Sequence, residues 1–327
     1  LIGCSNLILI FVGGNQYINE SIEIGVLAEF IIYVNMLTWP VAVVGWITSI
    51  VQQAEASQKR INAFVEQQPE IRSGKGIDSK IIGDIEFKNV SLTYPETGIQ
   101  ALDNLNLIIP SGSTLGIIGN IGSGKSTLLD IILRLYDPTK GGVYLDGHNL
   151  KEFKINKLRN SIGYVPQNGF LFSESIENNI RFGNPNASFG VIRDYAKKAV
   201  VDNNIVKFKD GYKTLLGERG ITLSGGQIQR ISIARALIKD PQILLLDDCL
   251  SSVDTDTEEE ILKHLKTITK NKTTLIVSHR ISSLKHADQI IVFKNGKIVQ
   301  QGQHADLLEI TGYYKELYEI QQANNSK

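Results

Sequence analysis

The sequence of 327 residues is poor in cysteine and has no excess of either charge. Its two cysteines, Cys4 and Cys249, lie far apart without metal-ligand spacing, so we expect reduced thiols and no disulfide. Lys plus Arg and Asp plus Glu both number 34, so no global field favours nucleic acid or acidic partners. There is also no internal repeat and no low-complexity run.

An initiator Met and a signal-peptide pattern are also lacking, although the first fifty residues are very apolar. Residues 1–12 are apolar, but twelve helical residues rise only about 18 Å. A bilayer core is about 30 Å thick. We therefore expect residues 1–12 to be the second half of a membrane helix, followed by a loop at 13–23. The chain is accordingly predicted to be a C-terminal fragment of a longer protein.

A second apolar segment, at about 25–51, is long enough to span a bilayer. Glu29, Asn35, Thr38 and Pro40 interrupt it. In a membrane such polar residues usually face other helices or a water-filled path, and Pro40 is expected to kink the helix. The alternative is a buried helix of a soluble protein.

The charges after this segment predict its orientation. Lys59 and Arg60 are the first positive residues, so the loop with Glu20 is expected outside and the rest of the chain in the cytoplasm. Residues 52–67 are rich in helix formers, so the helix should continue into the cytosol and end before Pro69.

Strand-like runs begin at about residue 83, after a flexible linker at 68–82. These runs are 85–94, 105–109, 115–118, 142–145, 162–165, 243–246, 274–277 and 290–293. Helical patterns lie between several of them, which predicts an α/β core with a largely parallel sheet. Residues 169–239 interrupt the alternation and are predicted to form an inserted helical subdomain. The predicted domains are therefore 1–67 and 83–327.

Residues 119–127 match the phosphate-binding P-loop pattern G-x-x-x-x-G-K-[ST]. The motif consists of Gly119, Asn120, Ile121, Gly122, Ser123, Gly124, Lys125, Ser126 and Thr127. Its glycines allow backbone N–H groups to surround a phosphate at the positive end of a helix. Lys125 is predicted to reach the β- and γ-phosphates, and the Ser126 hydroxyl to ligate Mg²⁺. The alternative, a glycine-rich turn that binds nothing, does not explain the strand before it and the helix after it.

Two further motifs follow. The apolar run 243–246 ends in Asp247, a carboxylate suited to hold Mg²⁺ beside the phosphates, usually through water. A second anion site is predicted where a Ser hydroxyl and glycine N–H groups precede the helical stretch 228–238. That motif is Leu223, Ser224, Gly225, Gly226 and Gln227.

With these motifs in this order, the sequence resembles ATP-binding cassette (ABC) ATPases over about residues 85–318. The resemblance implies an α/β P-loop NTPase with an added antiparallel β subdomain, and ATP and Mg²⁺ as ligands. It implies that Tyr94 stacks on adenine and that Gln167 contacts Mg²⁺ or the attacking water. His279 would contact the γ-phosphate, and a D-loop at 251–254, with Asp254, would cross a dimer interface.

Other segments resemble type IV ABC exporters. Residues 214–220 look like the X-loop, and 37–40 and 56–61 look like the last membrane helix, which leads into the ATPase. The resemblance implies a half-transporter of the plasma membrane, multi-pass in the bilayer, with a cytoplasmic nucleotide-binding domain. It would pair with a second half-transporter, so that 223–227 of one chain completes the ATP site of the other. The first four membrane helices and part of the fifth would be missing.

The transported substrate cannot be read from the sequence, and drug, lipid and peptide export all stay open. A soluble ABC ATPase is a rival interpretation, against which the apolar N-terminal segment and the X-loop argue. No nucleic-acid partner is expected.

Asp248 departs from the family pattern, since most active members have Glu there as general base. Asp is one methylene shorter, so its carboxylate would lie roughly 1.5 Å further back, and a 1 Å misplacement can cost about 10²-fold in rate. One interpretation is a slow ATP site in a heterodimer. The other is a working Asp in a homodimer, which the retained His279 favours.

Overall fold

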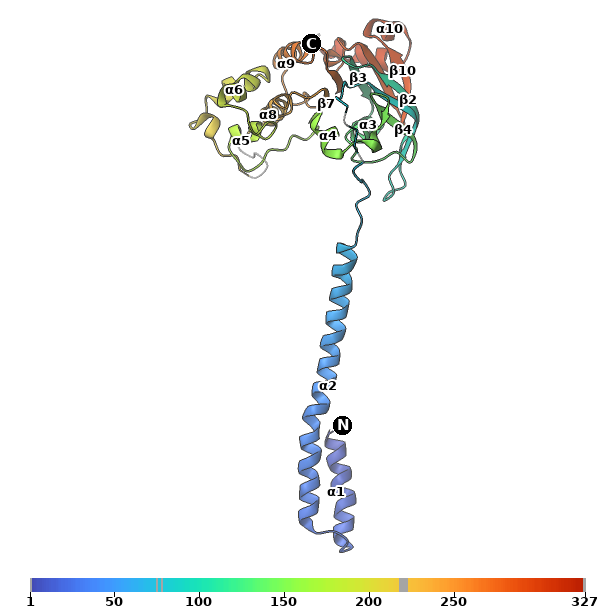
Figure 1. The fold of residues 1–327 in the computed structure, drawn as a ribbon, viewed down its shortest axis with the longest axis vertical. Helices are drawn as coiled ribbons and strands as arrows, with labels where there is room; N and C mark the ends of the chain where they lie inside the picture. The colour runs from blue at the N-terminus through green and yellow to red at the C-terminus, as the bar shows by residue number, and fades with distance from the viewer. Residues whose placement is uncertain (1, 75, 78, 218–222, 326–327) are drawn as a thin grey trace. The chain divides into compact units, whose positions relative to one another are not determined.

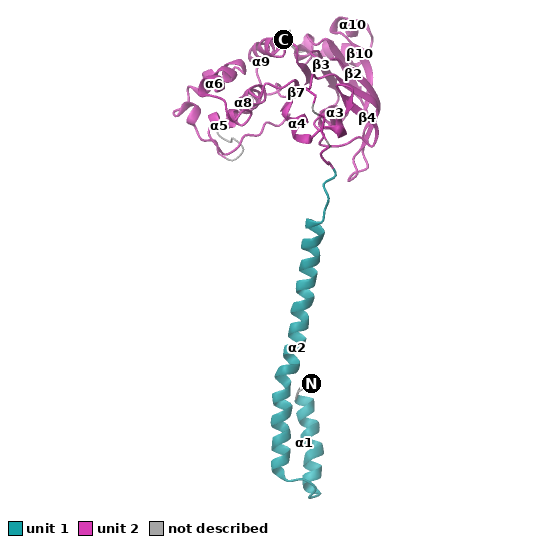
Figure 2. Ribbon diagram, viewed as in Figure 1, with its two compact units in different colours: residues 1–70 teal, residues 71–327 magenta. Residues whose placement is uncertain are grey.

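The computed structural model describes residues 2–74, 76–77, 79–217 and 223–325. The chain divides into two compact units, Leu1–Glu70 and Ile71–Lys327 (Figure 2).

The first unit contains two helices, α1 (Ile2–Ile18) and α2 (Ile24–Val65), which lie side by side (Figure 1). The predicted loop at 13–23 is therefore wrong in part, because α1 continues through Gly13 and Gly14 to Ile18. Packing explains the difference. A Cβ on Gly13 would lie 2.3 Å from Leu27 Cδ1 of α2, so this glycine permits close approach and does not break the helix.

The long helix α2 is apolar, and none of its described residues is buried within the structure. Among the described residues, it is the one helix long and apolar enough to cross a membrane, by length and composition only. Its polar Asn35 accepts a hydrogen bond from Asn6 Nδ2 of α1, at 3.2 Å, which fits the expectation that such residues face another helix. The helix ends four residues before Pro69, as predicted.

The second unit is built on a six-stranded sheet of order β10-β9-β3-β8-β7-β6. The strands are β3 (Thr114–Gly119), β6 (Ile162–Val165), β7 (Ile243–Asp247), β8 (Thr273–Val277), β9 (Gln289–Lys294) and β10 (Lys297–Gly302). All neighbours pair in parallel except β10, which is antiparallel to β9. This confirms the predicted largely parallel sheet.

A separate antiparallel sheet has the order β2-β1-β4-β5. Its strands are β1 (Ile85–Thr93), β2 (Gln100–Ile109), β4 (Lys140–Leu145) and β5 (His148–Asn149). The antiparallel subdomain implied by the resemblance is thus present. The predicted strands all exist, whereas β5 and β10 were missed. β5 has only two residues, and β10 is a half-exposed edge strand without an apolar run.

Helices surround these sheets. They are α3 (Lys125–Ile132), α4 (Ile155–Asn160), α5 (Ile176–Arg181), α6 (Phe189–Lys198), α7 (Asp202–Ile205), α8 (Gly225–Leu237), α9 (Thr255–Ile268), α10 (His304–Glu309) and α11 (Tyr313–Asn325). The four helices α5 to α8 lie in the stretch predicted as a helical subdomain. α8 begins three residues before the predicted start.

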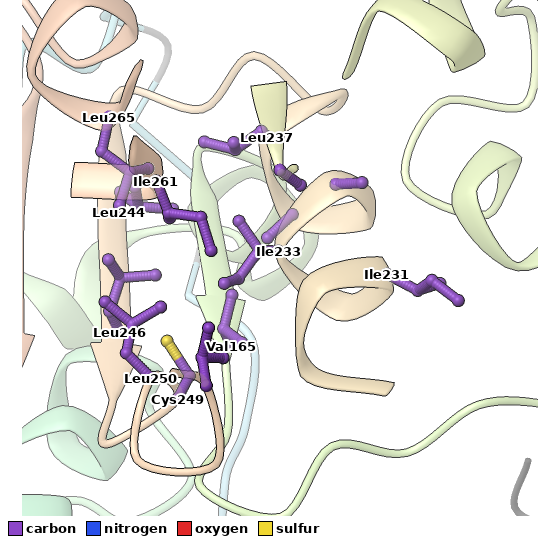
Figure 3. Close-up of a cluster of buried hydrophobic side chains, with 14 of the residues drawn as sticks. Val165, Ile231, Ile233, Leu237, Leu244, Leu246, Cys249, Leu250, Ile261 and Leu265 are labelled. Atoms are coloured by element: carbon purple, nitrogen blue, oxygen red, sulfur yellow. The ribbon is translucent and has the colours of Figure 1, made fainter. Parts of the chain in front are cut away.

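Two hydrophobic clusters cover the opposite faces of the parallel sheet, because successive strand residues point to opposite sides. Leu244 and Leu246 of β7 belong to one cluster, and Leu245 belongs to the other. Figure 3 shows the first cluster, in which side chains of β6, β7, α8 and α9 meet around Val165 and Ile233. The second cluster joins the sheet to α3 and the antiparallel strands. Both faces are covered, so polar groups can gather only at the sheet's edges.

Candidate functional site

The predicted site residues gather at the carboxyl edge of the parallel sheet. In register, Ile117 of β3 and Asp247 of β7 both lie beside Val277 of β8, while Val165 of β6 lies beside Leu246. The P-loop follows β3, Asp248 follows β7, His279 lies two residues beyond β8, and Gln167 lies two beyond β6. Segments up to 160 residues apart in sequence thus end at one place.

The P-loop depends on glycine at its crowded positions. A Cβ on Gly119 would lie 2.2 Å from Phe293 O, and one on Gly124 would lie 2.5 Å from Ala101 O. Gly124 also has a φ of 106°, which favours glycine. The loop therefore wraps tightly against β9 and β2, and its backbone leads directly into α3.

Lys125 and Ser123 provide the chemistry of an anion site. Lys125 is buried, and its Nζ donates hydrogen bonds to Gly119 O and Asn120 O, both at 2.8 Å. Burial lowers the pKa of Lys125, and the nearby Asp247 and Asp248 oppose that shift. The hydroxyl of Ser123 is buried without a hydrogen-bond partner among the described residues. A bound phosphate would satisfy this hydroxyl and give the ammonium a charged partner.

Acidic groups lie beside the lysine. Burial raises the pKa of Asp247, and Asp248 adds to this, whereas a hydrogen bond from the Ser126 hydroxyl lowers it. Burial, together with the charge of Asp247, also raises the pKa of Asp130 to about 6. Asp130 lies one helical turn after Ser126 and was missed from the sequence. A hard cation held by the Ser126 and Asp247 oxygens would relieve this repulsion, so the residues fit Mg²⁺.

Asp248 and Gln167 meet at this edge. Asp248 is buried, has a φ of 43°, and its N–H donates to Val277 O at 2.9 Å. Its carboxylate accepts a hydrogen bond from Gln167 Nε2, at 3.4 Å. The structure thus brings together the two residues predicted to handle the attacking water.

Gln229 links three parts of the site and was not predicted. Its Nε2 donates to Gln167 O, and its Oε1 accepts from Ser252 N, both at 3.3 Å. The side chain is buried on α8, one turn before the buried Ile233. A glutamine on the apolar face of a predicted helix was the available signal. Gln229 therefore joins the helix of the second anion motif to the Gln167 loop and the D-loop.

His279 and Tyr94 lie at the margins of the site. His279 is close enough to Asp247 to oppose the burial-driven rise in the pKa of that carboxyl. The Tyr94 hydroxyl lies 3.0 Å from Thr127 Oγ1 of α3, and its ring packs edge-on against Tyr136, at a centroid distance of 5.0 Å. Tyr94 is therefore next to the P-loop helix.

The second anion motif lies at the start of α8. Ser224 Oγ accepts from Gln227 N at 3.3 Å, and Ser224 N donates to Gln227 Oε1 at 3.0 Å, which is a capping box. This cap explains the earlier helix start. A Cβ on Gly226 would lie 2.8 Å from Ser252 O, so the motif packs on the D-loop.

Within one chain, the hydrogen bonds described for residues 223–227 do not reach the P-loop. Residues 218–220 of the predicted X-loop lie outside the described residues. In the D-loop, Asp254 caps α9 by accepting from Thr257 N at 3.0 Å, and this hydrogen bond lowers its pKa.

These features define a P-loop nucleotide-binding domain. The parallel sheet has a P-loop after one strand and acidic residues after a second, and the positive end of a helix dipole lies at Lys125. Residues 102–251 match the model of the ABC transporter family. Residues 102–251 therefore carry the ATP-binding domain of an ABC transporter.

Known relatives match nearly the whole chain. The uncharacterized ABC transporter ATP-binding protein YknU of Bacillus subtilis (strain 168) is 42% identical over 315 residues, which are 96% of this chain and 54% of the relative. The multidrug resistance-like ATP-binding protein MdlA of Buchnera aphidicola is 43% identical over 318 residues, 97% of this chain and 55% of the relative.

A solved structure is also similar, that of a bacterial Atm1-family ABC exporter with ATP bound. It has 32% sequence identity and a TM-score of 0.79, and the match covers 92% of this chain and 53% of the exporter chain. This chain therefore spans about half the length of the relatives that it matches.

Proposed function

We propose that the chain is part of an ABC exporter half-transporter that hydrolyses ATP to drive efflux. The observation that carries this proposal is the meeting of the P-loop, Gln167, Asp247, Asp248 and His279 at one sheet edge. The match to the ABC transporter relative YknU covers 96% of this chain and so takes in most of the apolar helices α1 and α2, so the proposal includes the membrane part of the chain.

The P-loop would hold the phosphates of ATP. Lys125, the Ser123 hydroxyl and the N–H groups at the start of α3 supply positive charge and donors. Tyr94 is placed beside the same helix and would offer its ring to the adenine.

Ser126, Asp247 and Gln167 would hold Mg²⁺, whose charge would neutralise the phosphates when bound. Their side chains supply the hydroxyl, carboxylate and amide oxygens that this hard cation prefers. Asp130 lies outside this set and would raise the local negative charge.

A second chain would complete the site with its own Leu223, Ser224, Gly225, Gly226 and Gln227. In the chain described here these residues are exposed or half-buried apart from Leu223, and they contact their own D-loop. ATP bound at the P-loop would favour the paired state, because the γ-phosphate would then have donors from both chains. Loss of that phosphate on hydrolysis would remove these contacts and reopen the dimer.

Asp248 would act as general base for the attacking water, and Gln167 and His279 would orient the water and the γ-phosphate. The hydrogen bond from Gln167 would hold the shorter carboxylate in place. Two alternatives remain within this proposal. Asp248 works in a homodimer, or it makes a slow site in a heterodimer whose partner carries the faster one.

The membrane part would comprise residues 1–67, with a linker at 68–82 before the nucleotide-binding domain at 83–327. The helix α2 would cross the plasma membrane and lie partly against lipid. Efflux of a drug-like substrate is proposed from the name of MdlA, a multidrug resistance-like protein, and lipid and peptide substrates are further possibilities.

The test is ATP turnover by the purified protein in lipid, beside its Asp248→Glu and Lys125→Ala variants. Turnover by the wild type, well above Lys125→Ala, would support hydrolysis at Asp248 and a homodimer. A slow wild type that Asp248→Glu accelerates would identify the slow-site alternative. Turnover unaffected by Lys125→Ala would refute the proposed site.

A further inference from the structure

The backbone around His279 leaves the sheet and loses its sheet partners. Ser278 N still donates to Ile117 O of β3, at 3.1 Å. Beyond it the chain turns into a short 3-10 helix, η4 (Ile281–Ser283). Backbone groups in such a turn need partners other than neighbouring strands, and side chains are one source of them.

Gln321 of α11 supplies two of these partners. Its Nε2 donates to His279 O at 2.7 Å, and its Oε1 accepts from Ile281 N at 2.9 Å. One planar amide therefore binds backbone groups on both sides of Arg280. Because the two bonds share a rigid plane, they fix the orientation of this stretch as well as its position.

The helix that carries Gln321 is itself held in the core. Tyr314 is fully buried, and Leu317 and Tyr318 pack against the same cluster that contains Ile281. A side chain on a packed helix is held more rigidly than one on a loop. Gln321 therefore acts from a fixed support.

The other side of the turn is held through Arg280. Its guanidinium pairs with the buried carboxylate of Glu258 and donates to Ser251 O and Val253 O of the D-loop, both at 3.2 Å. His279 thus lies between two anchors, one on the D-loop and one on α11.

We propose that Gln321 is a positioning residue, which sets the backbone from which the His279 imidazole reaches the γ-phosphate. This inference rests on the proposed function, because it gives α11 a role in the hydrolysis assigned to the sheet edge. Gln321 bonds to backbone atoms of the turn and acts only through His279.

The experiment compares Gln321→Ala and Gln321→Glu with Glu319→Ala, a control at an exposed position of the same helix. Gln321→Ala removes both hydrogen bonds. Gln321→Glu keeps an acceptor for Ile281 N but replaces the donor to His279 O with a carboxylate. Three quantities are measured on the purified protein in lipid: hydrogen exchange of the Ile281 amide, ATP affinity and ATP turnover.

Gln321→Ala should speed exchange at Ile281 severalfold and lower turnover roughly tenfold, within the about 10²-fold that a 1 Å misplacement can cost. ATP affinity should stay as in the wild type, because the P-loop is untouched. Gln321→Glu should lower turnover while Ile281 stays protected. Glu319→Ala should change none of the three.

Unchanged exchange at Ile281 in Gln321→Ala would overturn the contact, and unchanged turnover would overturn the positioning role. Equal losses of affinity and turnover would indicate general destabilisation and also overturn it. If the wild type itself neither binds nor hydrolyses ATP, the proposed function fails, and exchange at Ile281 still decides whether Gln321 holds the turn.

Discussion

The two halves of the proposed nucleotide site differ in how their polar groups are satisfied. The sheet-edge half comprises Gly119–Thr127, Gln167, Asp247, Asp248 and His279. It holds buried charges with shifted pKa values and, among the residues that the structure describes, a buried hydroxyl without a hydrogen-bond partner. The signature half, residues 223–227, satisfies its own Ser224 and Gln227 in a capping box and packs on the D-loop.

This difference indicates which half needs a ligand to satisfy its polar and charged groups. The sheet-edge half carries electrostatic conflict that a phosphate and a cation would relieve, so it is built around a ligand. The signature half satisfies Ser224 and Gln227 within the chain and has exposed residues at the start of α8. We infer that ligand binding starts on the sheet edge and that the signature half joins it from another chain.

The largest expected effect comes from removing the ammonium of the sheet-edge half. Lys125→Ala should abolish ATP turnover, because the phosphate charge loses its main partner. Turnover is measured beside Lys209→Ala, which removes an exposed lysine from the helical subdomain and should leave the rate unchanged. Full activity in Lys125→Ala would show that the buried charges at the sheet edge do not bind the phosphates of ATP.

A smaller effect is expected from Tyr94, which lies at the margin of the sheet-edge half. Tyr94→Ala should weaken ATP binding by about 1–2 kcal/mol if the ring stacks on adenine. Tyr94→Phe keeps the ring and loses only the contact with Thr127, so its affinity should stay near that of the wild type. Affinities are measured by nucleotide titration. Equal weakening in both variants would assign the effect to the hydroxyl.

The smallest effect concerns stability and pH in the absence of nucleotide. The pKa of Asp130 is raised from 3.8 to about 6 in the folded protein, so the folded state binds more protons between these values. The contribution of Asp130 to stability should therefore fall as pH rises from about 4 to about 6. The midpoint of thermal unfolding should fall less over this window in Asp130→Asn than in the wild type.

The exposed Asp210→Asn provides the control for that measurement and should follow the wild-type curve. Identical pH profiles for Asp130→Asn and the wild type would show that the Asp130 carboxylate does not contribute to the electrostatic repulsion at the sheet edge.

Much of the sheet-edge half could be predicted because its motifs are local. The P-loop and the strand before Asp247 have patterns that do not depend on distant residues. Asp130 and Gln321 could not be recognised, since their importance comes from burial and from contacts with segments far along the chain. Gln229 was missed although its place on the apolar face of a predicted helix was a signal, because its partners lie in distant segments. The extent of α1 was missed because packing at Gly13 overrides the low helix propensity of glycine.

The roles assigned to Tyr94, Asp248, His279 and Asp254 stay predictions, because their geometry agrees with the roles without testing them. The structure also shows a structural role for Asp254, which is the N-cap of α9.

The most direct test of the central claim uses mixed dimers of two copies of this chain with different tags. Lys125→Ala disables the sheet-edge half of a chain, and Ser224→Ala disables its signature half. With both changes on one chain, each of the two shared sites receives one of the changes, so both sites are lost. With one change on each chain, both changes fall in the same site, and the other site stays intact.

The measurement is nucleotide trapped per dimer. The account predicts trapped nucleotide when Lys125→Ala and Ser224→Ala are on different chains, and almost none when both are on one chain. The reverse result, with trapping retained when both changes are on one chain, would mean that each chain builds its own site and would contradict the account.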